Sequence, residues 1–302
     1  MKLIPFYILL IITHQTKACD ICGCGISGTN INGIIPQFNK NIIGLRTMYN
    51  AFQHPNTPEN YNGTNRVIKD NYLSTDLWFR YYPNKRLQMV FALPYKSISR
   101  EQSNKTIHVN GIGDATMMLN YSILKPNDST DQNFMWWAGG GLKIPTGKYQ
   151  QRDEEKTMYP IGLQTGNGAY SFSLNNQMTY KKNKVIVNSV SQFLMNYKNE
   201  LNFQLGNIYS TQLVGMYKKR IGCESYLIPN IGVEWIKSEQ DKSYGIFNHH
   251  SGATTLSMQL GLDYFINSFF ISANIKQPKS LNTYSSQPIQ QLNGSFNLGY
   301  VF

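Results

Sequence analysis

Three of the four cysteines in the chain lie within six residues of one another near its beginning. Cys19, Cys22 and Cys24 form a Cys-x-x-Cys-x-Cys motif with two interspersed glycines. Thiolates at this spacing can converge on one soft metal ion such as copper(I) or zinc(II). The fourth cysteine, Cys223, falls in a predicted turn on the same side of the membrane as the motif. The pattern therefore indicates a copper or zinc site with Cys19, Cys22, Cys24 and Cys223 as ligands.

The same cysteines allow two other interpretations. An exported chain meets an oxidising compartment, and four cysteines permit three disulfide pairings. A loop closed by Cys19 and Cys22 would be small and strained, which favours a redox-labile bond or a metal over a purely structural bridge. Acylation of Cys19 is the third interpretation, although Thr16 stands where a lipoprotein normally has an aliphatic residue. The sequence leaves all three open.

A second group with chemical potential is the run His249, His250 and Ser251. A serine activated by the nearby His249 would resemble the site of outer-membrane phospholipase A. That chemistry needs a third polar group to orient the imidazole, and the sequence identifies none. We therefore expect no enzymatic activity and no catalytic residues, and we rank a lipase last among the functional hypotheses.

The elements that must position these residues are strands. Successive side chains of a strand point to opposite faces, and a barrel in lipid places apolar residues outward and polar or small residues inward. This alternation is cleanest over 87–96, 170–180 and 256–264, where only Asn176 interrupts an apolar row. No apolar run outside the first residues approaches the roughly 20 residues that a membrane-spanning helix needs.

The pattern predicts an all-β fold, a transmembrane antiparallel up-and-down β-barrel of twelve strands. The expected strands are 40–53, 72–82, 86–99, 113–125, 132–145, 169–182, 184–197, 202–218, 224–238, 252–266, 269–278 and 292–302. We expect one barrel domain over 40–302, preceded by a cysteine-containing segment over 19–39 that forms a plug or a periplasmic tail.

The connections between these strands support the same count. Short polar turns alternate with longer polar segments, such as 100–112 and 146–168, and only the connection near Asn199 is short where a long loop is expected. Bacterial barrels have short periplasmic turns and longer external loops, and an even number of strands returns both termini to the periplasm. The turn that contains Cys223 is accordingly expected in the periplasm.

Charged residues also fall on the predicted inner face of the barrel. They can line a narrow aqueous path or brace the lumen through paired charges. The residues expected to face the lumen are Arg46, Asp76, Arg80, Lys96, Lys143, Glu234, Asp263 and Lys276.

Residues 1–18 have the layout of a secretory signal. Lys2 precedes an apolar stretch over 3–12, and Thr16 and Ala18 occupy the small-residue positions of a cleavage site before Cys19.

The formal net charge of +11 would ordinarily suggest a nucleic-acid partner. We expect no such partner, because the basic residues are scattered through turns and an exported chain meets little nucleic acid.

The end of the chain predicts the other partners. Apolar residues alternate with polar or small ones over 295–302, and the sequence stops on Phe302. This resembles the terminal-aromatic sorting signal of outer-membrane barrels, which implies recognition by the barrel-assembly machinery through the final strand. Outer-membrane lipid and small solutes are the remaining expected partners.

Two segments resemble known families. Residues 19–25, CDICGCG, together with residues 34–46, resemble the start of a family of uncharacterised outer-membrane barrels from Bacteroidota. The run GGLKIPTG at 140–147 is similar to a strand-and-loop motif in transporter-like barrels of the MetA-pathway phenol-degradation type. Together they cover less than a quarter of the chain. The resemblance implies a location in the bacterial outer membrane and a transport role, and it supplies no substrate.

The leading functional hypothesis is a narrow, passive porin-like channel for small solutes, linked to copper or another soft metal through its N-terminal cysteines. The alternative is a non-conducting structural or sensing barrel whose N-terminus binds a metal or a partner. Transport requires an inner path that solutes can cross, whereas the alternative requires only a stable barrel.

Overall fold

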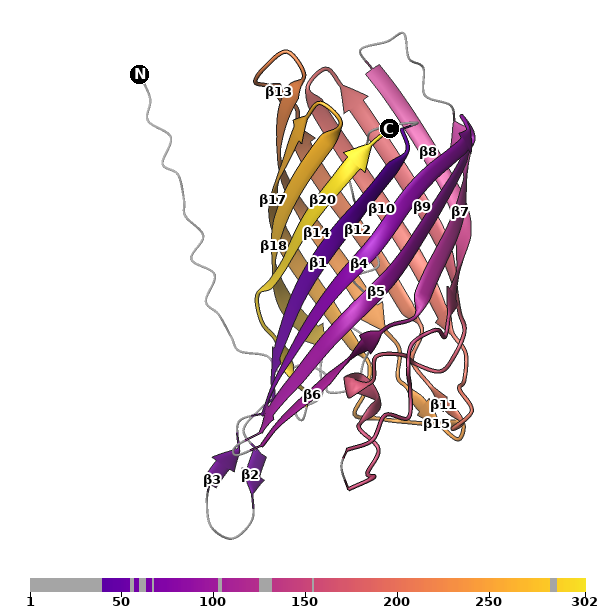
Figure 1. The fold of residues 1–302 in the computed structure, drawn as a ribbon, viewed down its shortest axis with the longest axis vertical. Coiled ribbons are helices and arrows are strands. Elements are labelled where there is room, and N and C mark those ends of the chain that lie inside the picture. Colours follow the sequence, from indigo (N-terminus) through magenta and orange to yellow (C-terminus); the bar gives the residue numbers. More distant parts are fainter. Residues whose placement is uncertain are drawn as a thin grey trace.

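The long strands of the chain form a sheet that closes on itself, because each one hydrogen-bonds to a neighbour on both sides (Figure 1). The order of the strands follows the sequence, and pairing of the first with the last seals the barrel. The computed structural model describes residues 40–54, 57–59, 64–66, 68–102, 105–124, 132–153, 155–282 and 287–302. The predicted signal over 1–18 and the segment over 19–39 lie outside the described residues.

Twelve antiparallel strands make the wall of the barrel, as the alternation predicted. They are β1 (Ile42–Gln53), β4 (Ile68–Asn84), β5 (Leu87–Gln102), β7 (Ala115–Leu124), β8 (Gln132–Ile144), β9 (Ser171–Lys182), β10 (Val185–Asn196), β12 (Ile208–Tyr217), β14 (Ser225–Ser238), β17 (Ala253–Ile266), β18 (Phe269–Asn282) and β20 (Asn293–Val301). The predicted fold class is confirmed.

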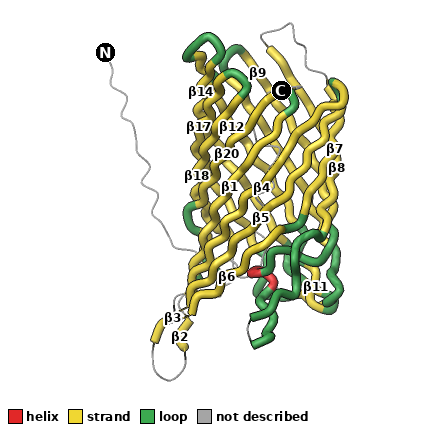
Figure 2. The backbone as a smooth tube through the Cα atoms, in the orientation of Figure 1, coloured by secondary structure: helices red, strands yellow, loops and turns green. Residues whose placement is uncertain are grey.

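Shorter elements occupy the connections. They are β2 (Thr57–Glu59), β3 (Thr64–Arg66), β6 (Lys105–Ile112), β11 (Phe203–Gln204), β13 (Lys219–Arg220), β15 (Lys242–Ser243), β16 (Ile246–Phe247), β19 (Ile289–Gln290) and the 3₁₀ helix η3 (Ile161–Leu163). Among the described residues no helix is long and apolar enough to cross a membrane. Figure 2 shows the longer loops and η3 gathered at the end of the barrel opposite the C-terminus.

Two sequence expectations about the connections were wrong. The strand predicted over 202–218 begins only at Ile208, because β11 leaves the barrel wall and pairs with β15 in another loop. The connection near Asn199, expected to be short, therefore runs over 197–207. The segment predicted as a loop over 100–112 contains β6, which pairs with the outer end of β5. The alternation of apolar and polar residues cannot show where a strand leaves the barrel wall, because an extended segment has the same pattern inside the wall and beyond it.

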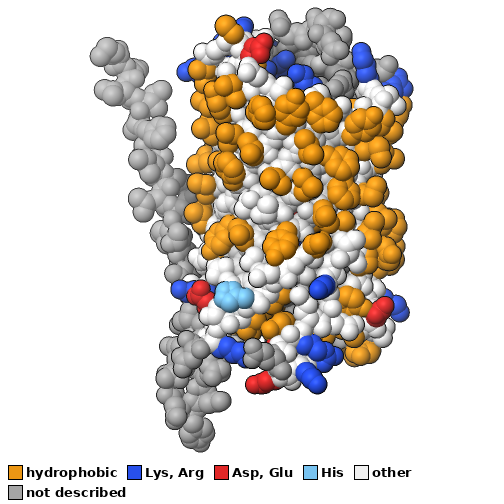
Figure 3. All heavy atoms as spheres, viewed as in Figure 1, with side chains coloured by type: hydrophobic (Ala, Val, Ile, Leu, Met, Phe, Trp, Pro, Cys, Tyr) orange, Lys and Arg blue, Asp and Glu red, His pale blue; other side chains and the backbone are white. Residues whose placement is uncertain are grey.

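The two faces of the wall differ as a barrel in lipid requires. Leu174, Ile231 and Leu260 point outward and are 58%, 64% and 63% exposed, whereas inward residues such as Thr179 and Asn188 are buried. In Figure 3 apolar side chains cover the midsection of the visible face, and charged side chains gather near its two ends. Apolar groups outside and polar groups inside are the arrangement of a membrane barrel and the reverse of a soluble one.

The interruption of the apolar row at Asn176 has a local explanation. The indole Nε1 of Trp136 on β8 donates a 2.7 Å hydrogen bond to the Asn176 side-chain oxygen on β9. Each polar atom therefore satisfies the other on the outer surface, where lipid offers no partner. An amide is tolerated in the outward row because a neighbouring indole binds it.

Near the short turns, four neighbouring strands each contribute one residue to a row across the inner wall. Two of these residues have aromatic rings and two are glycines. Gly44 on β1 is directly opposite both Trp78 on β4 and Gly299 on β20, and Gly299 is in turn opposite Phe270 on β18. A Cβ added at Gly299 would lie 2.3 Å from a ring carbon of Phe270. The two rings fit at this level because the residues between them have no side chain.

This row predicts that adding one methyl group at Gly299 destabilises the folded barrel, whereas adding one elsewhere on the same strand does not. Gly299→Ala should lower the free energy of unfolding by about 1–3 kcal/mol, because the ring of Phe270 must move. Urea unfolding of the folded barrel in lipid vesicles, followed by heat-modifiable migration, measures this. Gly294→Ala is the matched control on the same strand, since its added Cβ would have its nearest neighbour at 4.0 Å.

Combining the change with Phe270→Ala tests the cause. In that background Gly299→Ala should cost much less, because the clashing ring is gone. An unchanged cost in the double variant would contradict the proposed contact.

Candidate conduction path

The inner wall of the barrel has an apolar layer at the end with the short turns. Its buried members come from ten different strands and include the rings of Trp78, Phe265 and Phe270. The ring centroids of Phe265 and Phe270 are 5.5 Å apart, and those of Trp78 and Phe270 are 6.3 Å apart. Sequence analysis expected polar or small residues on this face, so the apolar layer corrects that expectation.

The middle of the inner wall is rich in side-chain amides that bind one another. Gln212 on β12 donates a 2.6 Å hydrogen bond to Gln259 on β17, and Gln192 donates a 2.9 Å bond to Asn175. An amide both donates and accepts, so neighbouring amides can bind one another, and an amide oxygen without a partner, such as that of Gln212, can accept a hydrogen bond from a polar solute. This layer suits uncharged polar groups as well as ions.

Charged pairs share the level of these amides on the inner wall, since Gln212 is opposite Glu234 and Gln259 is opposite Lys276. Arg46 on β1 forms an ion pair with Asp76 on β4, and Lys276 on β18 lies 2.9 Å from a carboxylate oxygen of Glu234 on β14. Each pair joins two strands of the wall. Paired charges keep the inner surface hydrophilic and leave little net charge in the low-dielectric barrel.

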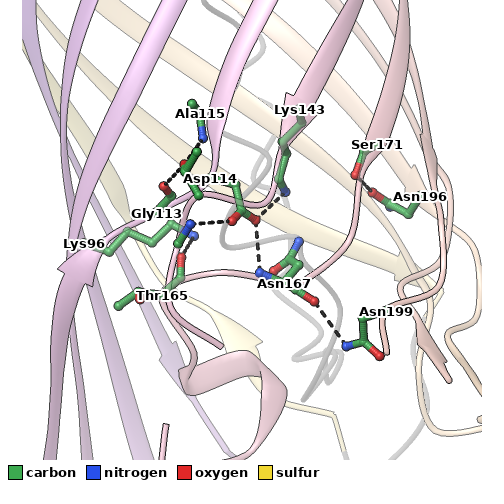
Figure 4. A network of polar contacts seen from close by, with 12 residues as sticks. Lys96, Gly113, Asp114, Ala115, Lys143, Thr165, Asn167, Ser171, Asn196 and Asn199 are labelled. Atoms are coloured by element: carbon green, nitrogen blue, oxygen red, sulfur yellow. Dashed lines mark hydrogen bonds and ion pairs between the residues drawn. The ribbon is translucent and has the colours of Figure 1, made fainter. Parts of the chain in front are cut away.

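A denser network lies where the lumen meets the external loops (Figure 4). The Lys96 amine donates a 2.8 Å hydrogen bond to the carbonyl oxygen of Thr165. Asp114 accepts hydrogen bonds from the backbone N–H groups of Gly147 and Asn167, at 3.1 and 3.0 Å, and lies 3.8 Å from the Lys143 amine. These contacts hold the connection over 145–170 against the inner edge of the mouth.

The structure places all eight residues that were expected to face the lumen on the inner face of the wall. Lys276 is half-buried, and the others are buried: Arg46, Asp76, Arg80, Lys96, Lys143, Glu234 and Asp263. It brings together Arg46 with Asp76 and Glu234 with Lys276, whereas Asp263 accepts a hydrogen bond from the amide of Asn230. Lys96 and Lys143 lie together in the network around Asp114, so the structure gathers some of these residues at the mouth and places others in pairs along the wall.

Sequence reasoning missed the residues that hold the mouth. Asp114 fell within the strand expected over 113–125 but was not named as lumen-facing, and β7 begins only at Ala115. Thr165 and Asn167 lie in a loop, to which alternation assigns no face. It also missed Asp70, which accepts hydrogen bonds of 2.7 and 2.6 Å from Arg100 and lies 2.9 Å from the ring of His54. The only available signal was the Gly-rich, Pro-containing composition of the 140–147 run, which indicates a turn without naming its contacts.

Of the four predicted metal ligands, only Cys223 lies among the residues that the structure describes. Cys19, Cys22 and Cys24 lie outside the described residues. Cys223 is exposed in the turn between β12 and β14, and its carbonyl oxygen accepts a 2.7 Å hydrogen bond from Arg220. Among the residues that the structure describes, no group of three or more potential ligands gathers at one point.

The histidine and serine run is arranged as a turn. His249 and His250 are exposed, whereas Ser251 is fully buried. The Ser251 hydroxyl donates a 2.7 Å hydrogen bond to the carbonyl of Asn248 and accepts a 2.8 Å bond from the N–H of Asp241. These contacts give Ser251 a structural role in the loop.

Asp241 joins two of the external loops. One of its carboxylate oxygens accepts a 2.7 Å hydrogen bond from the N–H of Gly206, and the other is buried without a hydrogen-bond partner. Burial raises the pKa of this carboxyl from 3.8 to about 7, although the Gly206 N–H opposes the shift. The folded loop therefore favours the protonated acid.

Several solved structures are similar to this chain. An outer-membrane channel from Pseudomonas putida F1 matches with a TM-score of 0.62 at 15% identity, over 89% of this chain and 97% of that chain. The β-domain of the Bordetella autotransporter BrkA matches at 0.47 and 9% identity, over 86% and 98%. A FadL homologue from Pseudomonas aeruginosa matches at 0.42 and 9% identity, over 87% and 90%.

No protein-family model and no curated protein sequence matches the chain. The fold is nevertheless settled by its own geometry and by the likeness to the Pseudomonas putida barrel. A closed antiparallel barrel with an apolar outer belt and a polar inner wall belongs in the bacterial outer membrane. The protein is a bacterial outer-membrane β-barrel of twelve strands.

The buried Asp241 predicts an unusual pH dependence of the external loops. An acid whose folded pKa is raised keeps its proton in the folded loop after the unfolded loop has lost it. The stability of the loop should therefore fall as the pH rises from 3.8 to about 7, and stay low above that. Proteolysis of the 239–252 loop should be slower at pH 5 than at pH 8 after correction for protease activity.

Asp241→Asn should abolish this difference, because the amide is neutral at both pH values. Asp153→Asn in another external loop is the control and should keep the pH dependence of the parent protein. Persistence of the full difference in Asp241→Asn would rule out this carboxyl as its source.

Proposed function

We propose that the protein is a narrow, passive channel for small polar solutes across the bacterial outer membrane. The observation that carries the proposal is the polar inner wall, where Lys96, Asp114 and Lys143 make polar contacts at the external mouth and ion pairs and amides line the middle of the barrel. A solute that leaves water for this wall exchanges hydrogen bonds with water for hydrogen bonds with fixed side chains. The path needs no catalytic group.

The apolar layer is assigned the role of a constriction in this proposal. Trp78 and Phe270 are fully buried in it, at the end with the short turns. Apolar constrictions in channels restrict ions by excluding water, so conduction would depend on the space that these rings leave. The path would be selective by size and polarity at this level and by charge nearer the mouth.

The likeness to the Pseudomonas putida channel supports the proposal at the level of the fold. Both chains match over nearly their whole lengths. The alternative of a non-conducting structural or sensing barrel is supported by the same buried pairs, because paired side chains can also brace a closed lumen.

Conductance separates the two alternatives. Purified protein in planar lipid bilayers should give discrete openings, and Trp78→Ala should raise the single-channel conductance about twofold, because the largest ring of the constriction is removed. Phe296→Ala is the matched control. Phe296 is a large outward-facing side chain, half exposed on β20, so its loss should leave conductance unchanged.

One result would count against a channel, and another against the constriction. Absence of openings in both the parent protein and Trp78→Ala would favour the non-conducting barrel. An equal conductance in the parent protein and Trp78→Ala would remove the apolar layer from the path. Heat-modifiable migration of each preparation shows that the barrel has folded.

The soft-metal link is a separate proposal. It is supported by the strand register: Ile42 at the start of β1 is opposite Val301, and Tyr217 at the end of β12 is opposite Val185, so both lie at the end of the barrel with the short turns. Cys223 belongs to the same turn region as Lys218. The beginning of the barrel and Cys223 are therefore at one end of the molecule.

Metal analysis tests this proposal. Protein purified under reducing conditions should bind about one copper or zinc ion per chain, and the combined change Cys19→Ser, Cys22→Ser and Cys24→Ser should abolish binding. Cys223→Ser should weaken it if this residue is the fourth ligand. Equal metal content in the parent protein and the triple variant would eliminate the site.

A further inference from the structure

A cleft of ≈ 760 Å³ opens on the outside of the barrel, where β8, β9 and β10 end at the external loops. It is separate from the inner path, because its lining side chains from β8 and β9 belong to the outward rows of the wall. This volume is in the range of binding sites for small molecules. The cleft lies on the outer surface and has no role in the proposed conduction path.

The lower wall of the cleft is apolar. Leu142 on β8 and Phe172 on β9 line it, and Phe172 is 46% exposed on the side that faces lipid. Tyr197, just after β10, packs its ring edge-on against Phe172, with ring centroids 5.9 Å apart. This wall is continuous with the apolar belt of the barrel, so it offers a hydrocarbon chain the same surroundings as the membrane interior.

The rim of the cleft is polar and belongs to the loops. The Tyr149 hydroxyl donates a hydrogen bond to a carboxylate oxygen of Glu200, and this bond raises the pKa of the phenol. This hydrogen bond holds the Glu200 carboxylate on Tyr149 without removing its charge. Lys198 lies beside it, is exposed, and forms no ion pair with another described side chain. The rim therefore presents the Lys198 cation above an apolar wall, next to a carboxylate that Tyr149 holds in place.

The floor of the cleft is held from inside the barrel. It contains Gly168 and Ala169, which directly follow Asn167 in the chain. The backbone N–H of Asn167 binds Asp114, and its carbonyl oxygen accepts a 3.2 Å hydrogen bond from the side chain of Asn199. The cleft is therefore preformed, so a ligand need not order the loop to bind.

We propose that this cleft binds an anionic amphiphile of the outer leaflet, with an acyl chain along Leu142 and Phe172 and an acidic headgroup at Lys198. The position of the cleft favours a membrane lipid over a dissolved solute, because its apolar wall continues into the lipid-facing belt. A cation at the boundary between belt and loops lies at the level of lipid headgroups.

Lipid retention by the purified full-length protein tests the proposal. The probes are dimyristoyl phosphatidic acid and dimyristoyl phosphatidylcholine, which share their chains and differ in net headgroup charge. Native mass spectrometry of the folded barrel should show preferential retention of phosphatidic acid. Lys198→Gln should lower that retention about fivefold, because one cation near a lipid surface is lost.

Two further variants separate the cleft from the rest of the surface. Leu142→Trp should fill the cleft from the lipid side and lower retention of both probes. Lys237→Gln is the matched control, since Lys237 is also exposed and outward-facing at the external end of its strand, β14, away from the cleft. It should leave retention unchanged.

Each other outcome contradicts the proposal. An equal loss in Lys237→Gln would show general attraction to surface charge. A loss in Leu142→Trp without one in Lys198→Gln would show an apolar ligand with no need of an anionic headgroup. Unchanged retention in both cleft variants would show that lipid binds elsewhere. None of these outcomes bears on conductance, so the channel proposal is tested independently.

Discussion

Backbone hydrogen bonding in lipid is the constraint on which the rest of this structure depends. Hydrocarbon offers no partner to a free N–H or carbonyl group, so a strand in the membrane must pair on both of its edges. Closure of β1 on β20 meets this requirement for the twelve long strands. Side chains are then free to differ between the two faces, because the backbone of the wall does not depend on them for its hydrogen bonds.

The inner face uses that freedom in layers. Near the short turns it is apolar, around Trp78 and Phe270, and the paired Gly44 and Gly299 make room for these rings. Toward the loops it becomes rich in amides and in ion pairs, and the Glu234–Lys276 pair lies level with the Gln212–Gln259 pair. A buried polar group must find a partner, and here most partners come from neighbouring strands. The same pairing that stabilises the wall gives the lumen its polar character.

Residues 165–169 of the connection between β8 and β9 contribute to both the mouth of the lumen and the outer cleft. Thr165 and Asn167 bind Lys96 and Asp114 at the mouth of the lumen, whereas the next two residues form the floor of the outer cleft. Contacts on the inside therefore fix the shape of a site on the outside. The connection is long enough to do this because it is not limited by the turn geometry that constrains the short, periplasmic connections.

The sequence by itself determined the number of strands, their approximate positions and the inward side of residues such as Arg46 and Lys143. It did so because strand periodicity is local and lipid requires an apolar outer face. Tertiary structure alone decided that Asp114 would meet Asn167, that Ile208 would begin a strand predicted from 202, and that Trp78 would pack at a glycine row. Those contacts join residues far apart in the chain, and their energies depend on the register between strands and on loop paths that no local pattern contains.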